Sequence, residues 1–188
     1  MNRRILGTLI AWLLLAGATP GHAEVTLVAD GAQLVDDGLG LRVRRPGERW
    51  TLVAGPGAAR MVAGAVAGGV VERGTRAVLL LHAGGAGQLE AVAREAVGHL
   101  GLPSQRLVQN VAVVFGGRRA RRVLVEGRRD GTEVAYRITF VPRMGRIVEI
   151  RAWRSGSGVM PAYVDLARFE RALTFVPVES PAAPTFVS

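Results

Sequence analysis

The feature that most constrains the fold is a run of four predicted strands between residues 107 and 153. The strands cover 107–115, 120–126, 133–141 and 146–153. The segments between them have the composition of turns: Gly116-Gly117, Arg129-Asp130-Gly131 and Pro142–Gly145. Because connections this short join neighbouring antiparallel strands, the segment predicts a β-meander.

Alternation along the third of these strands predicts two faces of different character. Large apolar side chains fall on one face and polar ones on the other, namely Val134, Tyr136, Ile138 and Phe140 against Glu133, Arg137 and Thr139. A strand of this kind is typical of a sheet that packs against a core on one side only.

The rest of the chain supplies further strands and two amphipathic helices. Strands are predicted at 24–28, 39–43, 50–53 and 77–81, whereas residues 61–71 consist of so many Val, Ala and Gly that periodicity leaves strand and helix open. Apolar residues three and four apart predict one helix over 89–100, ended by Gly101, and another that starts at Pro161 and runs through Leu173 to Val176. The chain is therefore predicted to be α+β, with an antiparallel sheet of about six strands packed by two main helices.

The two ends differ in character from this central domain, which is predicted to span residues 24–176. Residues 1–23 resemble a secretory signal peptide, with Arg3 and Arg4 before an apolar run and small residues ahead of a cleavage point after Ala23. The alternative is an uncleaved membrane anchor, but the apolar run at 5–18 is shorter than the roughly 20 residues that span a bilayer. Residues 177–188 are predicted to be a disordered, Pro-rich tail. We therefore expect a periplasmic or secreted protein with no membrane span after cleavage.

Composition narrows the partners that such a protein can have. The absence of cysteine excludes disulfides, thiolate chemistry and a lipid-bearing cysteine. All 24 basic residues are arginine, against 15 acidic residues, so the chain is strongly cationic. Outside the cytoplasm this charge favours an anionic envelope surface or an acidic envelope protein as partner, and not nucleic acid. The alternative is that arginine is the solvating cation that a GC-rich genome supplies.

Several apolar anchors occur in an order that resembles a known superfamily. They are Leu39–Val43 with Pro46-Gly47 and Trp50, Ala77–Leu81, Leu89–Leu100, Gly117 with Ala120 and Glu126-Gly127, Tyr136-x-Ile-x-Phe140, Ile147–Trp153, and Phe169 to Phe175. In this order the chain resembles the PsbP-like α/β/α sandwich proteins, including bacterial envelope relatives of the DcrB type. The resemblance covers most of residues 39–176 and implies a non-catalytic binding or assembly subunit. The chain departs from the lipoprotein members because it has no cysteine.

The best candidate for a binding surface is a group of arginines on the meander. The group comprises Arg118, Arg119, Arg121, Arg122, Arg128 and Arg129 on the second strand, extended by Arg137 and Arg151 on the neighbouring strands. Alternation places Arg119 and Arg121 on one face and Arg118 and Arg122 on the other. Guanidinium groups bind carboxylates and phosphates well, so the group predicts an anionic partner. The alternative is a solvated sheet face whose charge is absorbed by cross-strand pairs with Glu126, Glu133 and Glu149.

Motifs for catalysis or for cofactor and metal binding are not apparent. Neither His82 nor His99 has the spacing of a metal ligand or a catalytic base. Gly84–Gly87 before a helix lacks the rest of a phosphate-binding motif, and the acidic turns at Asp36-Asp37 and Asp130 lack the pattern of a calcium loop. The sequence thus predicts no catalytic residue, cofactor or metal site, and an exported, non-enzymatic binding or assembly module of the bacterial cell envelope. Two alternatives remain open: a peripheral binder of anionic lipid or lipopolysaccharide through an arginine-rich sheet face, and an enzyme whose site is assembled from scattered residues.

Overall fold

The computed structural model describes residues 25–28, 30–71, 74–156 and 159–178. The predicted signal peptide lies outside these residues, as does the predicted tail from residue 179 onward. Among the helices within the described ranges, none is long and apolar enough to cross a bilayer.

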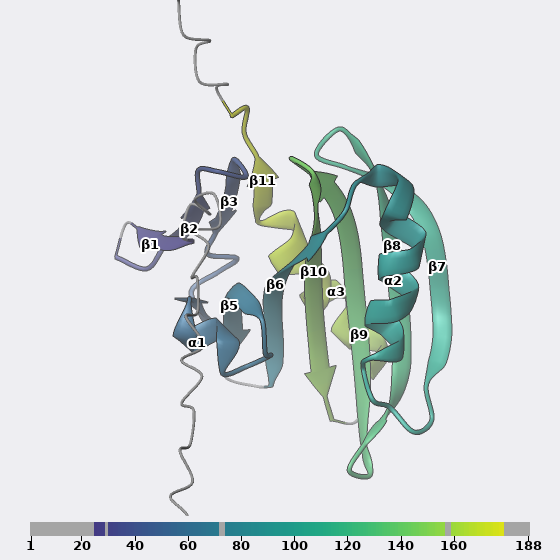
Figure 1. The fold of residues 1–188 in the computed structure, drawn as a ribbon. Coiled ribbons are helices and arrows are strands. Elements are labelled where there is room, and N and C mark those ends of the chain that lie inside the picture. Colours follow the sequence, from purple (N-terminus) through teal and green to yellow (C-terminus); the bar gives the residue numbers. More distant parts are fainter. Residues whose placement is uncertain (1–24, 29, 72–73, 157–158, 179–188) are drawn as a thin grey trace, which may run out of the picture.

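Seven antiparallel strands form the larger of two sheets (Figure 1). Their order across the sheet is β4 (Trp50–Ala54), β5 (Ala65–Val71), β6 (Thr75–Ala83), β10 (Arg146–Ser155), β9 (Thr132–Arg143), β8 (Arg118–Arg129) and β7 (Arg106–Phe115). The last four are the predicted meander, in which each strand pairs with the next along the chain. Residues 65–71, where the sequence left the choice open, are a strand.

A second, smaller sheet corrects the prediction of a single sheet of about six strands. It contains β1 (Thr26–Val28), β2 (Gln33–Asp36), β3 (Leu41–Arg44) and β11 (Leu173–Phe175), in that order. The sequence predicts only a turn around Asp36 and a last helix that continues through Leu173 to Val176. Instead, the helix ends at Arg171, and Leu173–Phe175 pairs with β3.

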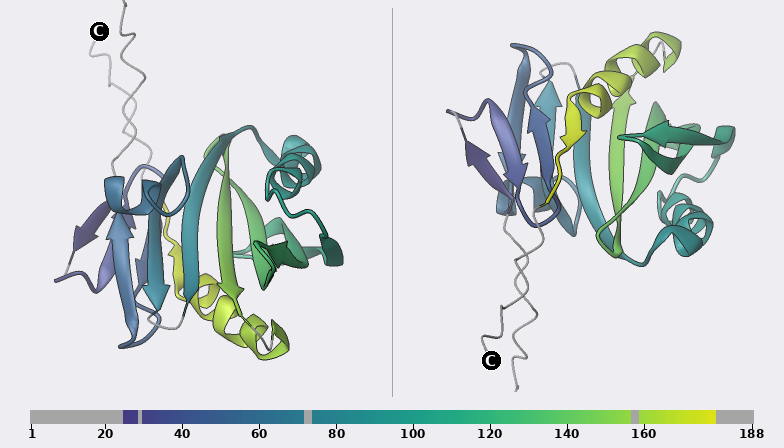
Figure 2. Two further views of the ribbon diagram at one scale, coloured as in Figure 1. Left: turned by 90° about the horizontal axis from the view of Figure 1, so that it is seen from below. Right: turned by 90° about the horizontal axis from the view of Figure 1, so that it is seen from above.

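The helices lie on opposite sides of the larger sheet (Figure 2). α2 (Leu89–Gly98) covers one face, together with the short α1 (Pro56–Ala59) and η1 (Ala86–Gln88) that precede it. α3 (Val159–Arg171) and the smaller sheet cover the other face. The described residues are mostly strand, so the expectation of a sheet packed by two main helices captures only part of the architecture.

Burial on both faces of the larger sheet explains how three layers hold together. On β9, the apolar set Val134, Tyr136, Ile138 and Phe140 packs under α2, as alternation predicted. The opposite face was expected to be polar, yet Ala135 and Val141 pack there against the smaller sheet and α3, with Thr139 fully buried beside them. The meander is therefore the middle layer, and its strands contribute to two separate cores.

Gly69 on β5 shows why a small residue is needed at this place in the larger sheet. A Cβ atom at Gly69 would lie 2.9 Å from the Trp50 ring and 3.1 Å from the Phe169 ring. These two rings pack together with their centroids 5.6 Å apart. Glycine thus lets α3 approach the sheet, which a larger side chain would prevent.

Glu126 on β8 connects the edge of the sheet with α3. It accepts a hydrogen bond of 2.8 Å from the Tyr163 hydroxyl and pairs with Arg106 on β7. The hydrogen bond from Arg106 is the main reason why the pKa of Glu126 is lowered from its ordinary 4.5. The pKa of Tyr163 is raised, mainly by burial and then by its bond to Glu126.

The lowered pKa of Glu126 predicts a pH-dependent contribution to stability. A carboxylate with a lower pKa in the folded state stabilises the protein above its unfolded-state pKa, and this contribution is lost as pH falls through the folded-state pKa. Glu126→Gln is therefore expected to unfold more easily than the wild type at pH 7, with a smaller difference at pH 3. Urea unfolding of both proteins at the two pH values measures this difference, and an equal difference at both would contradict the prediction.

The described end of the chain is held against the turn between β2 and β3. The Val176 amide donates a hydrogen bond of 2.7 Å to the Gly40 carbonyl. The buried Arg143 side chain donates to the Leu39 carbonyl at 2.7 Å and to the Val176 carbonyl. Burial lowers the pKa of Arg143, whose guanidinium also lies over the Phe175 ring. The chain is thus tied to the smaller sheet as far as Val176.

Candidate functional site

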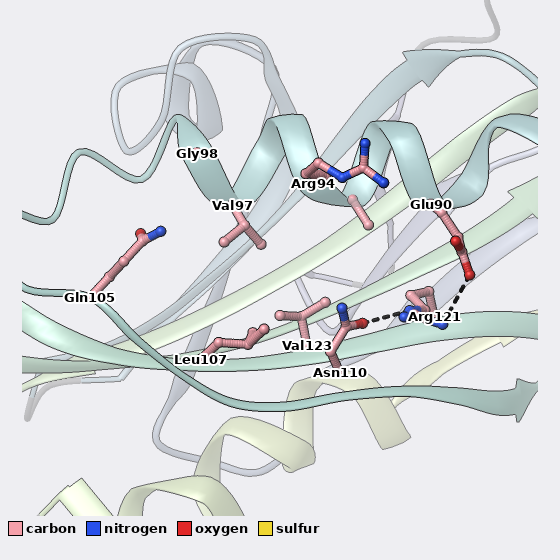
Figure 3. Close-up of a pocket in the computed structure, with 10 residues that line it drawn as sticks. Glu90, Arg94, Val97, Gly98, Gln105, Leu107, Asn110, Arg121 and Val123 are labelled. Atoms are coloured by element: carbon pink, nitrogen blue, oxygen red, sulfur yellow. Dashed lines mark hydrogen bonds and ion pairs between the residues drawn. The ribbon is translucent and has the colours of Figure 1, made fainter.

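A groove runs between α2 and the strands β7 and β8 on one face of the larger sheet (Figure 3). One hollow of about 330 Å³ has apolar walls formed by Ala93 and Val97 of α2, Leu107 of β7 and Val123 of β8. In Figure 3, Val97 points from the helix toward Leu107 and Val123. This side of α2 therefore faces a space that an apolar group can fill.

A polar bridge crosses the groove at Arg121. The Arg121 guanidinium donates a hydrogen bond of 2.5 Å to the Asn110 side chain and lies 3.2 Å from the Glu90 carboxylate (Figure 3). It thereby links β8 with both β7 and α2. Beyond the bridge, a second hollow of about 410 Å³ shares Glu90 and Arg121 and is also lined by Arg119. We call the two hollows together the α2–β7 groove.

The outer wall of the groove is β7, the edge strand of the larger sheet. Three of its apolar side chains are exposed: Leu107 is 54% exposed, Val108 43% and Val114 78%. Their strand pairs with β8 on one side only, and its register shifts between Leu107 and Gln109. A long edge strand with exposed apolar side chains is a template on which another strand can pair.

The eight predicted arginines divide between the two faces of the sheet. Arg119, Arg121, Arg129 and Arg151 belong to the face covered by α2, whereas Arg118, Arg122, Arg128 and Arg137 belong to the face of α3. The predicted alternation within β8 is thus correct. The prediction that Arg137 and Arg151 extend one arginine-rich face is wrong, because they project from opposite sides.

Most of these arginines have partners within the described part of the chain. Glu170 of α3 pairs with Arg122 and, at 2.6 Å, with Arg137. Arg151 pairs with Glu149, and Arg129 donates a hydrogen bond of 2.9 Å to the Leu100 carbonyl. Among the described residues, Glu126 forms a cross-strand pair with Arg106, which is not one of the eight, and Glu149 pairs with Arg151 within its own strand. The positive charge of these arginines is therefore neutralised mainly by groups on α2 and α3 and not by neighbouring strands. Of the eight, Arg119 and Arg121 line the groove.

The histidines have different surroundings. His82 Nε2 lies 2.7 Å from the buried Glu149 carboxylate, which also holds Arg151. His99 follows the last turn of α2. Among the described residues, no three His, Asp or Glu side chains come together in a way that could hold a metal ion.

The glycine-rich and acidic segments are connections. The Gly85 amide donates to the Gln88 side chain at the start of η1. Asp36 accepts a hydrogen bond of 2.9 Å from the Leu39 amide, which closes the turn between β2 and β3. Asp130 and Gly131 both have positive φ angles in the turn between β8 and β9. Turn chemistry accounts for these segments, as the sequence suggested.

The groove was not predicted from the sequence because it depends on how far α2 stands from β7. Asn110 and Glu90, which hold Arg121, are unremarkable in their own segments. The available signal was the presence of adjacent apolar residues, Leu107-Val108 and Val113-Val114, which place apolar side chains on both faces of the predicted strand.

Comparisons with known proteins identify the fold. No protein-family model and no curated protein matches this sequence. Among solved structures, the chain is similar to cyanobacterial PsbP (CyanoP) from Synechocystis sp. PCC 6803, with a TM-score of 0.57 and 11% identity over 83% of this chain and 95% of that one. It is also similar to LpqN of Mycobacterium tuberculosis, a protein involved in cell envelope biogenesis, with a TM-score of 0.51 and 18% identity over 73% of this chain and 83% of that one.

These likenesses establish a PsbP-like fold, as the order of apolar anchors predicted. At sequence identities this low, structural similarity is evidence for a shared fold and not for a shared activity.

Proposed function

We propose that this protein is a non-enzymatic binding module of the cell envelope and that its partner occupies the α2–β7 groove. An exported location is supported by the signal-like residues 1–23 and by the structural likeness to LpqN, which is described as a protein of envelope biogenesis. The partner we infer is an extended acidic segment of another envelope protein, which adds a strand to β7.

The observation that carries this proposal is the combination of an open strand edge with a cationic groove beside it. Within the described residues no strand pairs with the outer side of β7, and side chains of an added strand would alternate between solvent and the groove. The exposed Leu107 and Val114 supply apolar contact area. Arg119 and Arg121 supply positive charge along the same face, which favours acidic side chains in the partner.

A second candidate is an anionic lipid or lipopolysaccharide bound in the same groove. It is favoured by the apolar walls at Ala93 and Val97, which suit an acyl chain, and by the nearby Arg121, which suits an anionic headgroup. The two candidates share the site and differ in the chemical nature of the occupant.

Site-specific crosslinking in the native envelope distinguishes these possibilities. A photoreactive residue at Leu107 is expected to capture a protein partner, because this position lies at the mouth of the groove. The matched control is Val164 on α3, which is 61% exposed on the other side of the sheet. The same products from both positions would contradict the proposal, and a lipid product at Leu107 alone would favour the second candidate.

A pair of charge reversals provides the control for electrostatics. Arg119→Glu with Arg121→Glu should remove the crosslink at Leu107. Arg42→Glu with Arg44→Glu changes the net charge equally but alters exposed positions on β3 of the smaller sheet, and should leave the crosslink intact.

A further inference from the structure

A third hollow on the α2 face shares no residue with the two hollows of the α2–β7 groove. It has a volume of about 280 Å³ and lies beside the C-terminal end of α2, next to His99 and Leu100. Three arginines from three strands line it: Arg76, Arg129 and Arg151. We call it the three-arginine hollow.

The register of the larger sheet brings these cations together. Trp153 on β10 is paired with Arg76 on β6 and with Tyr136 on β9. Arg151 is two residues before Trp153 on β10, so both project from the same face. Arg129, at the end of β8, lies over the Tyr136 ring at 5.9 Å from its centroid. Four neighbouring strands therefore direct cationic and aromatic side chains to one place.

Much of the hydrogen-bonding capacity of these arginines remains available. Arg151 uses its Nε to pair with Glu149, and Arg129 uses one terminal nitrogen for the Leu100 carbonyl and also hydrogen-bonds the Tyr136 side chain. Arg76 is exposed at the rim. Because each guanidinium has five N–H donors, these contacts with described residues use only part of the donors of Arg129 and Arg151.

The balance of charge also favours an anion. Among the described residues that line the hollow there is no carboxylate, and Glu149, which pairs with Arg151, is enclosed in the adjacent core. Burial raises the pKa of Tyr136, while Arg129 and Arg151 act against this rise, so both positive charges are felt at its hydroxyl. Three like charges converge with one carboxylate beside them, which is an arrangement that an anion would stabilise.

We propose that the three-arginine hollow binds a phosphate group. Guanidinium groups bind phosphate oxygens in a bidentate manner, and several donors arranged around a small polar hollow suit a tetrahedral oxyanion. The phosphate can belong to a free phosphate or to a lipid headgroup, since the recognising chemistry is the same.

An NMR titration of the purified protein with inorganic phosphate tests the site directly. Shifts centred on the resonances of His99, Arg129 and the Trp153 indole are expected, and chloride at equal ionic strength should not produce them. Arg76→Gln is expected to weaken phosphate binding about tenfold, the effect of losing roughly 1.4 kcal/mol of a charge-assisted contact. The matched control Arg42→Gln removes an exposed arginine of the smaller sheet and should leave the affinity unchanged.

The results of this titration either support or contradict phosphate binding in the three-arginine hollow. No shifts with phosphate, or equal loss of affinity in Arg76→Gln and Arg42→Gln, would overturn the proposal, and the spectra themselves report whether each variant is folded. Vesicles of phosphatidylglycerol then identify the source of the phosphate. Binding to vesicles that free phosphate displaces, and that Arg76→Gln weakens, assigns a lipid headgroup, whereas phosphate binding without vesicle binding assigns a soluble phosphate.

Discussion

Replacing Glu170 by alanine is expected to lower the free energy of unfolding by about 3 kcal/mol, near the lower end of the range for removing one partner of a buried ion pair. The residue is 5% exposed, and its carboxylate accepts hydrogen bonds from Arg122, Arg137 and Thr139. Its loss leaves two guanidinium groups without a carboxylate between α3 and the sheet. The lower end of the range applies because both arginine side chains retain some contact with water.

Urea unfolding followed by tryptophan fluorescence measures this effect. Trp50 is a suitable reporter because its ring packs against Phe169, the neighbour of Glu170. Glu170→Gln should lie between the alanine variant and the wild type, since an amide oxygen still accepts hydrogen bonds but carries no charge. The matched control Glu48→Ala removes an exposed acid and should change the free energy by no more than about 0.5 kcal/mol. A Glu170→Ala variant as stable as this control would show that α3 does not depend on the ion pair.

The meander could be predicted from the sequence because its evidence is local. Turn residues at 116–117 and 130–131 stand between strands that are long enough to show alternation, and these strands pair with their neighbours in the chain. The same alternation correctly divided Arg119 and Arg121 from Arg118 and Arg122. Period and turn chemistry are properties of short segments, so no knowledge of distant contacts was needed.

Two strands of the smaller sheet, at 24–28 and 39–43, could be predicted, but the sheet as a whole could not, because β2 and β11 are short and β11 comes from a distant part of the chain. β11 has three residues that continue the apolar spacing of α3, and only pairing with β3 makes Leu173–Phe175 a strand. β2 overlaps an acidic turn signal at Asp36. Tertiary pairing determined both segments against their local patterns.

The candidate sites depend on contacts between layers, which sequence spacing does not report. Arg122 and Arg137 looked like surface cations until α3 supplied Glu170 from a distant position. Arg76, by contrast, attracted no attention in the sequence and lines the three-arginine hollow through its register with Trp153. Which arginines are available to a ligand is therefore decided by the packing of α2 and α3 on the sheet.

Glu149→Ala is expected to lower the free energy of unfolding by about 3–5 kcal/mol, at least as much as Glu170→Ala. The side chain is fully buried on β10 and pairs with both His82 and Arg151. Because Arg151 is the less exposed of the two partners, we expect it to contribute the larger coupling energy. Double-mutant cycles measured by urea unfolding test this order, since they isolate the interaction of each pair. A larger coupling for Glu149 with His82 would reverse our assignment.

The Glu149→Ala variant also tests phosphate binding in the three-arginine hollow, because phosphate binding raises the thermal stability of the protein. Without Glu149, the Arg151 guanidinium can direct all its donors to a bound phosphate. A ligand that binds only the folded protein raises its stability more when its affinity is higher. Phosphate at a fixed concentration is therefore expected to raise the Tm of Glu149→Ala by more than that of the wild type, whereas chloride at equal ionic strength should raise neither. Equal shifts in the two proteins would mean that Arg151 does not contact the anion, and the phosphate site would then have to rest on Arg76 and Arg129 alone.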